Sequence, residues 1–375
     1  MCFGVLHHLK KVVLGLNKLL RILCLGPIFL TACGTGVYPP ESSVANDTQV
    51  LTPEIALSSN LSIAPLKDPM ELLQCALPYT SDSIWNTPID WNSIRVHPSS
   101  EQMLDAFFSG DSWVGSDTSQ YAPNIYFVDN NTKLMPVTLW ENRSFRDAFS
   151  DVEIQYGEQG GTVLLPLPAD ARPAPGTDGE LVIINLDTGE EWGMVNGKID
   201  DQGFWSVGGV YRYSVKNSGV PPKGFAHRGA GIGSLAGIIR PCEVERGKIG
   251  HAVTIAYDYP CAPEICNANG WPEVILPFSK TDGEGFSQFD LPEGARLAIK
   301  PQVSIEEIST ACNNVKGCIV WTLNMQEFGG FIVDNSGHPK TYAEGNMTAN
   351  WDDAVWSKNM LMNIPKDWYV VLDWN

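Results

Sequence analysis

The sequence predicts a mainly β fold, and more finely a β-sandwich of the jelly-roll or concanavalin-like kind with a few peripheral helices. From Gly161 onward, short apolar runs alternate with turn-forming clusters of Gly, Pro and Asp, such as Asp187-Thr188-Gly189. Few segments show a helical spacing of apolar residues, and 43% of the chain is hydrophobic, enough to build a core. Many strands with few helices are typical of packed β-layers.

Residues 1–32 predict a lipoprotein signal peptide. An apolar run at 22–30 follows a positive flank made of Lys10, Lys11, Lys18 and Arg21. The run ends in Leu30-Thr31-Ala32-Cys33, a small-residue cleavage pattern in which the Cys carries the lipid. It is shorter than the about 20 residues that a membrane-spanning helix needs. We therefore expect lipidation at Cys33 and anchoring to the bilayer at the outer membrane or cell surface; the alternative is an ordinary secretory signal with an incidental Cys.

The elements are expected in the following order. Residues 33–74, rich in Ser, Thr, Asn and Pro, predict a flexible tether, and 75–375 the sandwich domain. A helix is expected at 99–108, where Ser99 or Ser100 can cap it. Strands are expected at Val163–Leu165, Leu181–Asn185, Glu191–Val195, Phe204–Tyr213, His251–Tyr257, Arg296–Ile299 and Phe331–Asp334. Two later helices are expected at Val315–Phe328, ended by Gly329-Gly330, and at Asp352–Met362.

Cysteine usage agrees with export. Six cysteines remain once Cys33 and those of the signal are set aside, an even number that predicts three disulfides in an oxidising compartment. Six cysteines allow about 15 connectivities. Short separations favour Cys261–Cys266 and Cys312–Cys318, which leaves Cys75–Cys242. Zinc-type Cys-x2-Cys spacing is absent and no His lies near the two short pairs, so neither a metal nor another cofactor is expected.

The charge excludes one class of partner. Without residues 1–32 the chain keeps 21 Lys and Arg against 43 Asp and Glu, a net charge of −22. Because nucleic-acid binding needs clustered basic residues, we expect no nucleic-acid partner. The same charge weighs against a polyanionic substrate unless a local basic groove opposes it.

The stretch from 227 to 257 holds the densest group of chemically capable residues. It supplies four candidate catalytic residues: Arg240, Glu243, His251 and Tyr257. They offer a guanidinium fork, a carboxylate, an imidazole that switches near neutral pH and a phenol. A structural interpretation stays open, in which Arg240 and Glu243 form an ion pair at a helix start with Pro241 at its first position.

Candidate substrate-binding residues are Trp85, Asn86, His227, Arg228, Lys280 and Asp334. Trp85 beside Asn86 can stack on a sugar and hydrogen-bond it, although a large aromatic residue also packs well in a core. Asp282-Gly283 and Pro292-Glu293-Gly294 are most simply turns. No G-x-S-x-G or H-E-x-x-H motif is present, which disfavours a protease or esterase.

Several segments resemble those of an uncharacterised family of secreted bacterial proteins that is common in actinobacteria. The likeness spans about residues 80–340 and is carried by Ile84–Ile89, Pro166–Gly179, Gly233–Pro241, Gly250–Ala252, Pro292–Arg296 and Val333–Asp334. The resemblance implies a β-sandwich similar to jelly-roll polysaccharide lyases and glucanases, a fold likeness that does not transfer a reaction. The chain departs from the commoner pattern in its additional Cys pairs.

These observations predict an envelope-anchored lipoprotein that acts on polysaccharide or cell-envelope glycan, as a lyase or a glycoside hydrolase. A lyase would use Arg240 to neutralise a uronate, His251 as base and Tyr257 as acid. A hydrolase would need two carboxylates, for which Glu243, Asp282 and Asp334 are the candidates. The alternative is a non-catalytic surface module that binds glycan or an envelope partner.

Overall fold

The computed structural model describes residues 75–140, 143, 145–149, 155–156, 161–225 and 227–374. The chain divides into two units, Met1–Leu57 and Ser58–Asn375, and every described residue belongs to the second. The expected signal peptide at 1–32, lipidation at Cys33 and tether at 33–74 therefore lie outside the described residues. Among the helices that are described, none is long and apolar enough to cross a membrane.

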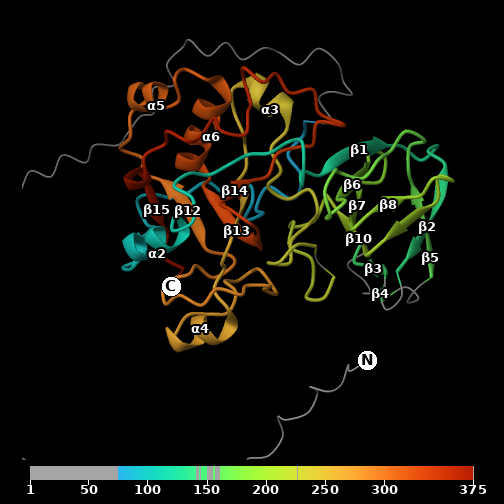
Figure 1. The fold of residues 1–375 in the computed structure, drawn as a ribbon, viewed down its shortest axis with the longest axis horizontal. Coiled ribbons are helices and arrows are strands. Elements are labelled where there is room, and N and C mark those ends of the chain that lie inside the picture. The colour runs from blue at the N-terminus through green and yellow to red at the C-terminus, as the bar shows by residue number, and fades with distance from the viewer. Residues whose placement is uncertain are drawn as a thin grey trace, which may run out of the picture. The chain divides into compact units, whose positions relative to one another are not determined.

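The fold consists of three mixed β-sheets with short helices, which confirms the mainly β prediction (Figure 1). The six-stranded sheet has the order β1 (Asn124–Val128), β6 (Leu181–Asn185), β7 (Glu190–Val195), β10 (Gly209–Ser214), β3 (Phe145–Asp147) and β4 (Gln155–Tyr156). The four-stranded sheet has the order β5 (Thr162–Pro166), β2 (Leu134–Leu139), β9 (Trp205–Val207) and β8 (Lys198–Ile199). The five-stranded sheet has the order β14 (Lys340–Thr341), β11 (Val253–Tyr257), β13 (Gly330–Asn335), β12 (Arg296–Ile299) and β15 (Tyr369–Val371).

The finer prediction of a jelly-roll or concanavalin-like sandwich is not confirmed. Each of the three sheets contains at least one parallel pair of neighbours: β1 with β6, β3 with β10, β2 with β9, and β11 with β13. Jelly rolls are built from antiparallel strands. The β-rich composition was therefore readable from the sequence, whereas the way in which strands pair was not.

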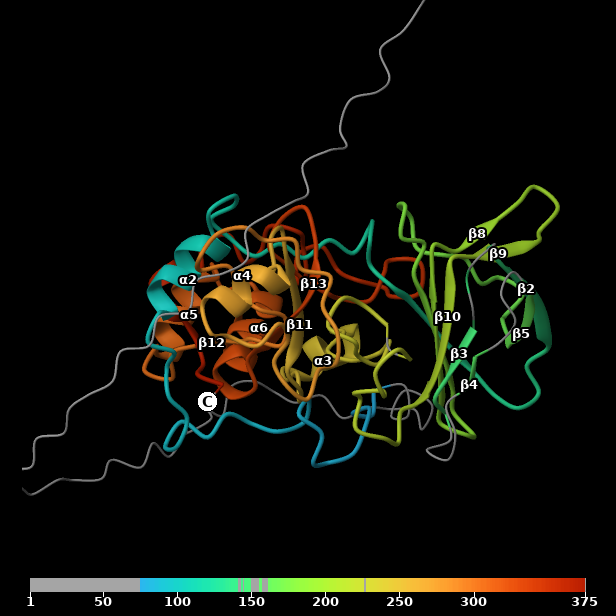
Figure 2. The same cartoon turned by 90° about the horizontal axis from the view of Figure 1, so that it is seen from below.

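Strand β6 is buried on both faces. Because side chains alternate along a strand, Leu181 and Ile183 point into a core shared with β2, β5 and β9 of the four-stranded sheet. Val182 and Ile184 point the other way and pack against Leu235 and, with it, the segment 227–240. The two sheets lie side by side in both Figure 1 and Figure 2. This second face supports residues 227–240, which we call the glycine-rich segment.

The carboxylate of Glu191, on β7, holds the glycine-rich segment against that face. It accepts hydrogen bonds from the Tyr79 hydroxyl at 2.7 Å, from the backbone N–H of Leu235 at 3.2 Å and from that of Ser234. Glu191 is only 1% exposed, and this burial raises its pKa to about 7. The hydrogen bonds that attach the glycine-rich segment to β7 therefore depend on the buried carboxyl group of Glu191.

Glu191→Gln is expected to stabilise the protein at neutral and mildly alkaline pH. Since the folded-state pKa is raised from 4.5 to about 7, the contribution of Glu191 is fully present below pH 4.5 and is lost as pH rises through about 7. The amide avoids this loss, which is worth up to about 3 kcal/mol at 1.36 kcal/mol per pH unit. Urea unfolding of both proteins across this range measures the effect; equal stability at every pH would contradict it.

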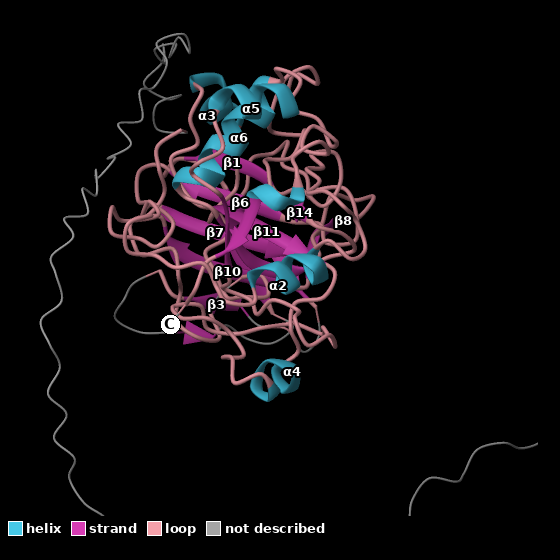
Figure 3. Cartoon of the chain, turned by 90° about the vertical axis from the view of Figure 1, so that its left-hand side faces the viewer, coloured by secondary structure: helices cyan, strands magenta, loops and turns pink. Residues whose placement is uncertain are grey.

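The helices pack around the five-stranded sheet. They are α2 (Ser100–Phe107), α3 (Pro241–Arg246), α4 (Pro263–Ala268), α5 (Ile305–Ala311), α6 (Lys316–Glu327) and the 3-10 turn η1 (Lys366–Trp368). Figure 3 shows α3, α5 and α6 gathered on one side of the strands. The buried side chains of Trp321 and Met325 on α6 join the core formed with β11, β12 and β15. A capping box of Ser304 and Glu307 starts α5.

Two of the three expected helices are confirmed, since α2 lies within 99–108 and α6 within Val315–Phe328. Gly329, with a φ of +67°, follows the end of α6 as expected of a glycine stop. The helix expected at Asp352–Met362 is wrong, because this segment forms turns. The carbonyl of Val355 accepts from the N–H of Gly317 in α6 at 3.1 Å, so tertiary contacts replace the helical ladder.

The seven expected strand segments all contain strands, but Phe204–Tyr213 is divided at Gly208 between β9 and β10, which belong to different sheets. A side chain at 208 would overlap Asn196, which explains the glycine at this break. The three expected disulfides, Cys75–Cys242, Cys261–Cys266 and Cys312–Cys318, are all present.

Candidate functional site

Arg240, Glu243 and His251 meet at the start of α3. The Arg240 Nη2 and the His251 Nε2 lie 3.0 and 3.1 Å from Glu243 Oε1. Glu243 Oε2 accepts the N–H of Arg240 at 2.9 Å, and Pro241 occupies the first helical turn. Burial alone would raise the pKa of Glu243, but the neighbouring Arg240 and His251 outweigh it and hold that pKa well below its usual value.

The three side chains are closed to solvent, with exposed fractions of 2%, 0% and 1% for Arg240, Glu243 and His251. Two cavities of the described chain, of about 890 and 660 Å³, are lined by other residues. This geometry is that of a structural ion pair at a helix start. The catalytic assignment of these residues stays a prediction, which a variant of Glu243 can test.

Tyr257 is also buried and lies on β11. Its hydroxyl donates to the carbonyl of Leu291 at 3.2 Å and accepts from the N–H of Leu291 at 2.6 Å. Burial raises the pKa of Tyr257 well above its usual value. The backbone at Leu291 therefore holds the Tyr257 hydroxyl.

Trp85 and Asn86 are placed by packing and by turn hydrogen bonds. Trp85 has no exposed surface; its ring lies 5.8 Å from that of Phe278 and 5.4 Å from that of Phe331. The Asn86 amide donates to the carbonyls of Pro78 and Thr80 at 2.9 and 3.0 Å. These contacts pack Trp85 into the core and fix the turn at Asn86, so they do not indicate a sugar-binding role for either residue.

Trp85→Ala is expected to lower the free energy of unfolding by about 3–5 kcal/mol, because it removes a fully buried aromatic side chain and leaves a cavity between Phe278 and Phe331. Trp85→Phe, which keeps one ring, should lose less. Urea unfolding monitored by circular dichroism measures both values. A loss of under about 1 kcal/mol for the alanine variant would contradict the packed position.

Four of the predicted substrate-binding residues come together elsewhere, at the end of β13. The Arg228 guanidinium bonds Glu180 Oε2 at 3.0 Å and Asp334 Oδ2 at 3.4 Å, and its Cζ lies 4.0 Å from the centre of the Tyr342 ring. Arg228 has a φ of +53°, in the left-handed region that non-glycine residues seldom adopt. Backbone strain of this kind gathers at functional sites.

The Asp334 carboxylate is oriented by three donors. Besides Arg228, the Tyr342 hydroxyl donates to Oδ2 at 3.1 Å and the Gly229 N–H to Oδ1 at 3.3 Å. The Asp334 side chain keeps 18% of its surface exposed, whereas that of Arg228 is fully covered. The carboxylate is thus both fixed in direction and open to a ligand.

A second and a third carboxyl group lie against Gly229. Any side chain at 229 would overlap both Asp282 Oδ1 and Glu293 Oε1, so the glycine makes room for the two acids. The Asp282 N–H donates to Glu293 Oε2 at 3.1 Å. We call Asp282, Glu293 and Asp334 the carboxyl cluster.

Asp282 and Glu293 lie close enough to influence each other's ionisation. Glu293 Oε1 is buried, and Asp282 Oδ1 approaches the same point beside Gly229. Two neighbouring carboxylates repel each other, which favours the protonated form, while a hydrogen bond with Glu293 acts to lower the pKa of Asp282. Burial and the charge of Asp334 raise the pKa of Asp282 to about 6; burial and the charge of Asp282 raise the pKa of Glu293 well above its usual value. Asp282 is exposed and Glu293 is buried.

Lys280 and His227 complete the surroundings. Burial lowers the pKa of Lys280, although Asp334, Asp282 and Glu293 act to raise it. His227 is buried and stacks on Tyr211 with 5.3 Å between ring centres; burial and the charge of Arg228 hold its pKa well below the usual value, which keeps the ring neutral. No three His, Cys, Asp or Glu side chains in the described part of the chain are arranged to hold a metal ion.

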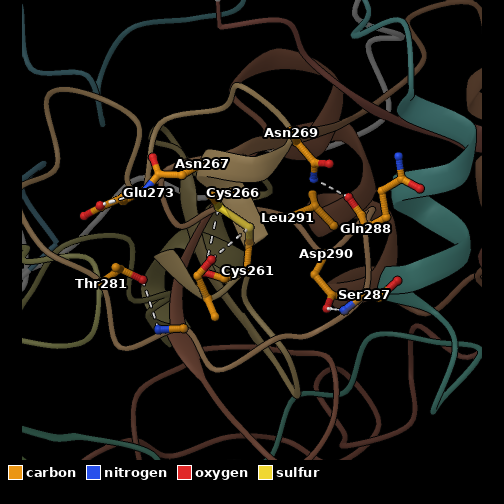
Figure 4. The surroundings of a disulfide bond; sticks show 12 residues. Cys261, Cys266, Asn267, Asn269, Glu273, Thr281, Ser287, Gln288, Asp290 and Leu291 are labelled. Atoms are coloured by element: carbon orange, nitrogen blue, oxygen red, sulfur yellow. Dashed lines mark hydrogen bonds between the residues drawn. A yellow bond between two sulfur atoms is a disulfide. The ribbon is translucent and has the colours of Figure 1, made fainter. Parts of the chain in front are cut away.

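The loop that carries Asp282 is attached to α4 and its disulfide. Figure 4 shows the Cys261–Cys266 disulfide close to Thr281 and Leu291, which flank this loop. Cys261 donates its N–H to the carbonyl of Leu291 at 2.8 Å, and Ala262 donates to that of Gly285 at 3.0 Å. Thr281 Oγ1 accepts the N–H of Gly283 at 2.9 Å, a bond that spans Asp282. These bonds hold the backbone on either side of Asp282.

Sequence reasoning named Asp282 and Asp334 among the candidate carboxylates of a hydrolase, while it interpreted Asp282-Gly283 and Pro292-Glu293-Gly294 most simply as turns. It did not single out Glu180 or Tyr342. In the structure residues 281–284 have no regular turn, and Glu293 forms a β-bridge with Val274. Comparison of the chain with protein-family models, with curated proteins and with solved structures finds no match.

Proposed function

We propose that the protein hydrolyses glycosidic bonds in a polysaccharide at the carboxyl cluster, with Asp282 as general acid and Asp334 as nucleophile or general base. One observation carries the proposal: an exposed carboxyl group with its pKa raised to about 6 lies near a second carboxylate that three donors orient. Glycoside hydrolysis uses two carboxyl groups whose environments give them these two different roles.

The proposed step is balanced by these residues alone. Asp282 gives its proton to the glycosidic oxygen, and the electron pair of the breaking carbon–oxygen bond moves to that oxygen. In one route Asp334 attacks the anomeric carbon, and water then cleaves the resulting sugar ester while the Asp282 carboxylate takes the proton of that water. In the other route Asp334 takes a proton from the water that attacks the anomeric carbon directly. The hydrogen bond from Glu293 stabilises the Asp282 carboxylate that the proton transfer leaves behind, and Arg228 keeps Asp334 in place.

Hydrolysis is preferred over a lyase reaction because the residues expected to carry a lyase reaction, Arg240, His251 and Tyr257, are buried and have structural partners. As part of the same proposal, a lipid on Cys33 holds the protein at the cell envelope. The six- and four-stranded sheets pack together in the manner of a sandwich and support the segment that carries Arg228. The sequence motif at 30–33 and the three disulfides support an exported protein.

The test is incubation of the exported chain with a panel of envelope and environmental polysaccharides, with two readouts. We expect new reducing ends without ultraviolet absorbance from unsaturated sugars. Unsaturated products would overturn hydrolysis in favour of a lyase. Binding of a polysaccharide without any cleavage would overturn it in favour of the non-catalytic module.

A further inference from the structure

A groove of about 890 Å³ opens beside the segment that leads to Asp282. Most of its polar lining consists of hydroxyl groups and two cations. Its wall includes Thr80, Tyr213 and Ser218, the cations Lys216 and Arg296, and one carboxylate, Asp82. A wall of hydroxyl groups and cations matches a ligand that carries both hydroxyls and negative charge.

Arg296 is a guanidinium without an acidic partner. Its Nε donates to the carbonyl of Phe328 and its Nη2 to that of Thr87, both at 2.8 Å. Within the described residues no carboxylate lies within ion-pair distance of it, and its Nη1 makes no hydrogen bond. Burial lowers its pKa to about 10, so it stays charged at neutral pH. The two backbone carbonyls and the Phe331 ring, whose centre lies 5.0 Å from Arg296 Cζ, fix the direction of this cation, and no carboxylate of the described residues pairs with it.

The groove lies close to the carboxyl cluster along the sheet. Arg296 pairs with Phe331 across β12 and β13, and Asp334 follows three residues later on β13. At about 3.3 Å per strand residue this separation is roughly 10 Å. The chain from Pro277, which lines the groove, reaches Asp282 five residues later. The backbone of the groove wall therefore lies within roughly 10 Å of the backbone of the cluster.

We propose that this groove, which we call the Arg296 groove, binds acidic sugar residues of the polysaccharide, with a sugar carboxylate held by Arg296 and Lys216. The inference rests on the proposed function and names its substrate class. The chain outside 1–32 has a net charge of −22, so an acidic polymer needs a local cationic site to be held. Lys216 is exposed, and its Nζ is oriented by the carbonyl of Thr188 at 2.8 Å.

The experiment compares binding of acidic oligosaccharides with binding of the same oligosaccharides after their carboxyl groups are reduced to alcohols. The probes are oligogalacturonate, oligomannuronate and hyaluronan fragments, measured by calorimetry. At least one acidic probe should bind about tenfold or more tightly than its reduced form, the effect of a charge-assisted hydrogen bond. Equal binding of both forms, or no binding of any acidic probe, would overturn the inference.

Variants locate the binding in this groove. Arg296→Gln and Lys216→Gln should each weaken acidic binding about tenfold. Lys216→Gln keeps the test decisive if Arg296→Gln fails to fold, since the Lys216 side chain is exposed. Lys133→Gln, an exposed lysine outside the groove, should bind as the unchanged protein does. If Lys216→Gln leaves acidic binding unchanged, the groove is not the site.

Failure of this inference and failure of the proposed function are distinguishable. Asp282→Asn should bind the acidic probe normally, since Asp282 does not line the groove. If acidic binding depends on Lys216 but nothing is cleaved, hydrolysis fails and the groove stands. If cleavage occurs and only neutral glycans are cleaved, hydrolysis stands and the groove assignment fails.

Discussion

Asp282→Asn is expected to lower kcat on the cleaved glycan by about 10²–10⁴-fold, with little change in KM. The amide cannot give a proton to the leaving oxygen, whereas the groove that binds the glycan is untouched. Initial rates of reducing-end release measure both constants. The matched control is Asp201→Asn, an exposed carboxylate of the turn between β8 and β9, which should have unchanged kinetics.

A second substrate shows whether Asp282 acts as an acid. An aryl glycoside with a good leaving group needs little protonation, so Asp282→Asn should slow its cleavage far less than that of the natural glycan. A structural role for Asp282 would slow both substrates equally. Equal loss on both would therefore contradict the assignment even if overall activity falls as expected.

The pH dependence follows from the raised pKa of Asp282. A general acid acts in its protonated form, so kcat/KM should fall as pH rises through about 6, the pKa of Asp282. A hydrogen bond with Glu293 lowers the pKa of Asp282, and Glu293→Leu removes it. The alkaline limb should therefore move to higher pH in this variant. A limb that stays in place would show that Glu293 does not control Asp282.

The sequence predicted those parts of the fold that local patterns determine. The apolar spacing and the Gly329 stop marked α6, and short runs between turn residues marked β6 and β7. It did not predict that Gly208 separates two sheets, where a side chain would overlap Asn196, a residue distant in the sequence. The same limit applied at 352–362, where the carbonyl of Val355 bonds the distant N–H of Gly317.

At the site, residue types were recognised and their convergence was not. Arg228 and Asp334 were candidates because of their charge and their place beside glycines or at a strand end. Asp282 and Glu293 are 53 and 64 residues from Gly229, and only the folded chain shows that the missing side chain at 229 brings them together. For Arg240 and Glu243 the spacing of three residues predicted an ion pair. Whether that pair is structural or catalytic depends on its burial, which only the tertiary structure shows.

Glu243→Gln is expected to lower the free energy of unfolding by about 3–5 kcal/mol at neutral pH, the effect of removing one partner of a buried ion pair. The change leaves the buried Arg240 guanidinium and His251 imidazole without the carboxylate that both contact. Urea unfolding measures the loss. The matched control is Glu245→Gln, an exposed glutamate on the same helix, for which a change within about 0.5 kcal/mol is expected.

The sign of the pH dependence is opposite to that of Glu191. Because the folded-state pKa of Glu243 is lowered, its contribution is present above its unfolded value of 4.5 and is lost as pH falls below it. The difference between the unchanged protein and Glu243→Gln should therefore shrink in acid. Activity per folded molecule separates the two interpretations of Arg240, Glu243 and His251. If Arg240, Glu243 and His251 are structural, the folded variant cleaves glycan at the normal rate. A large loss of kcat in folded protein would instead show that these residues are catalytic.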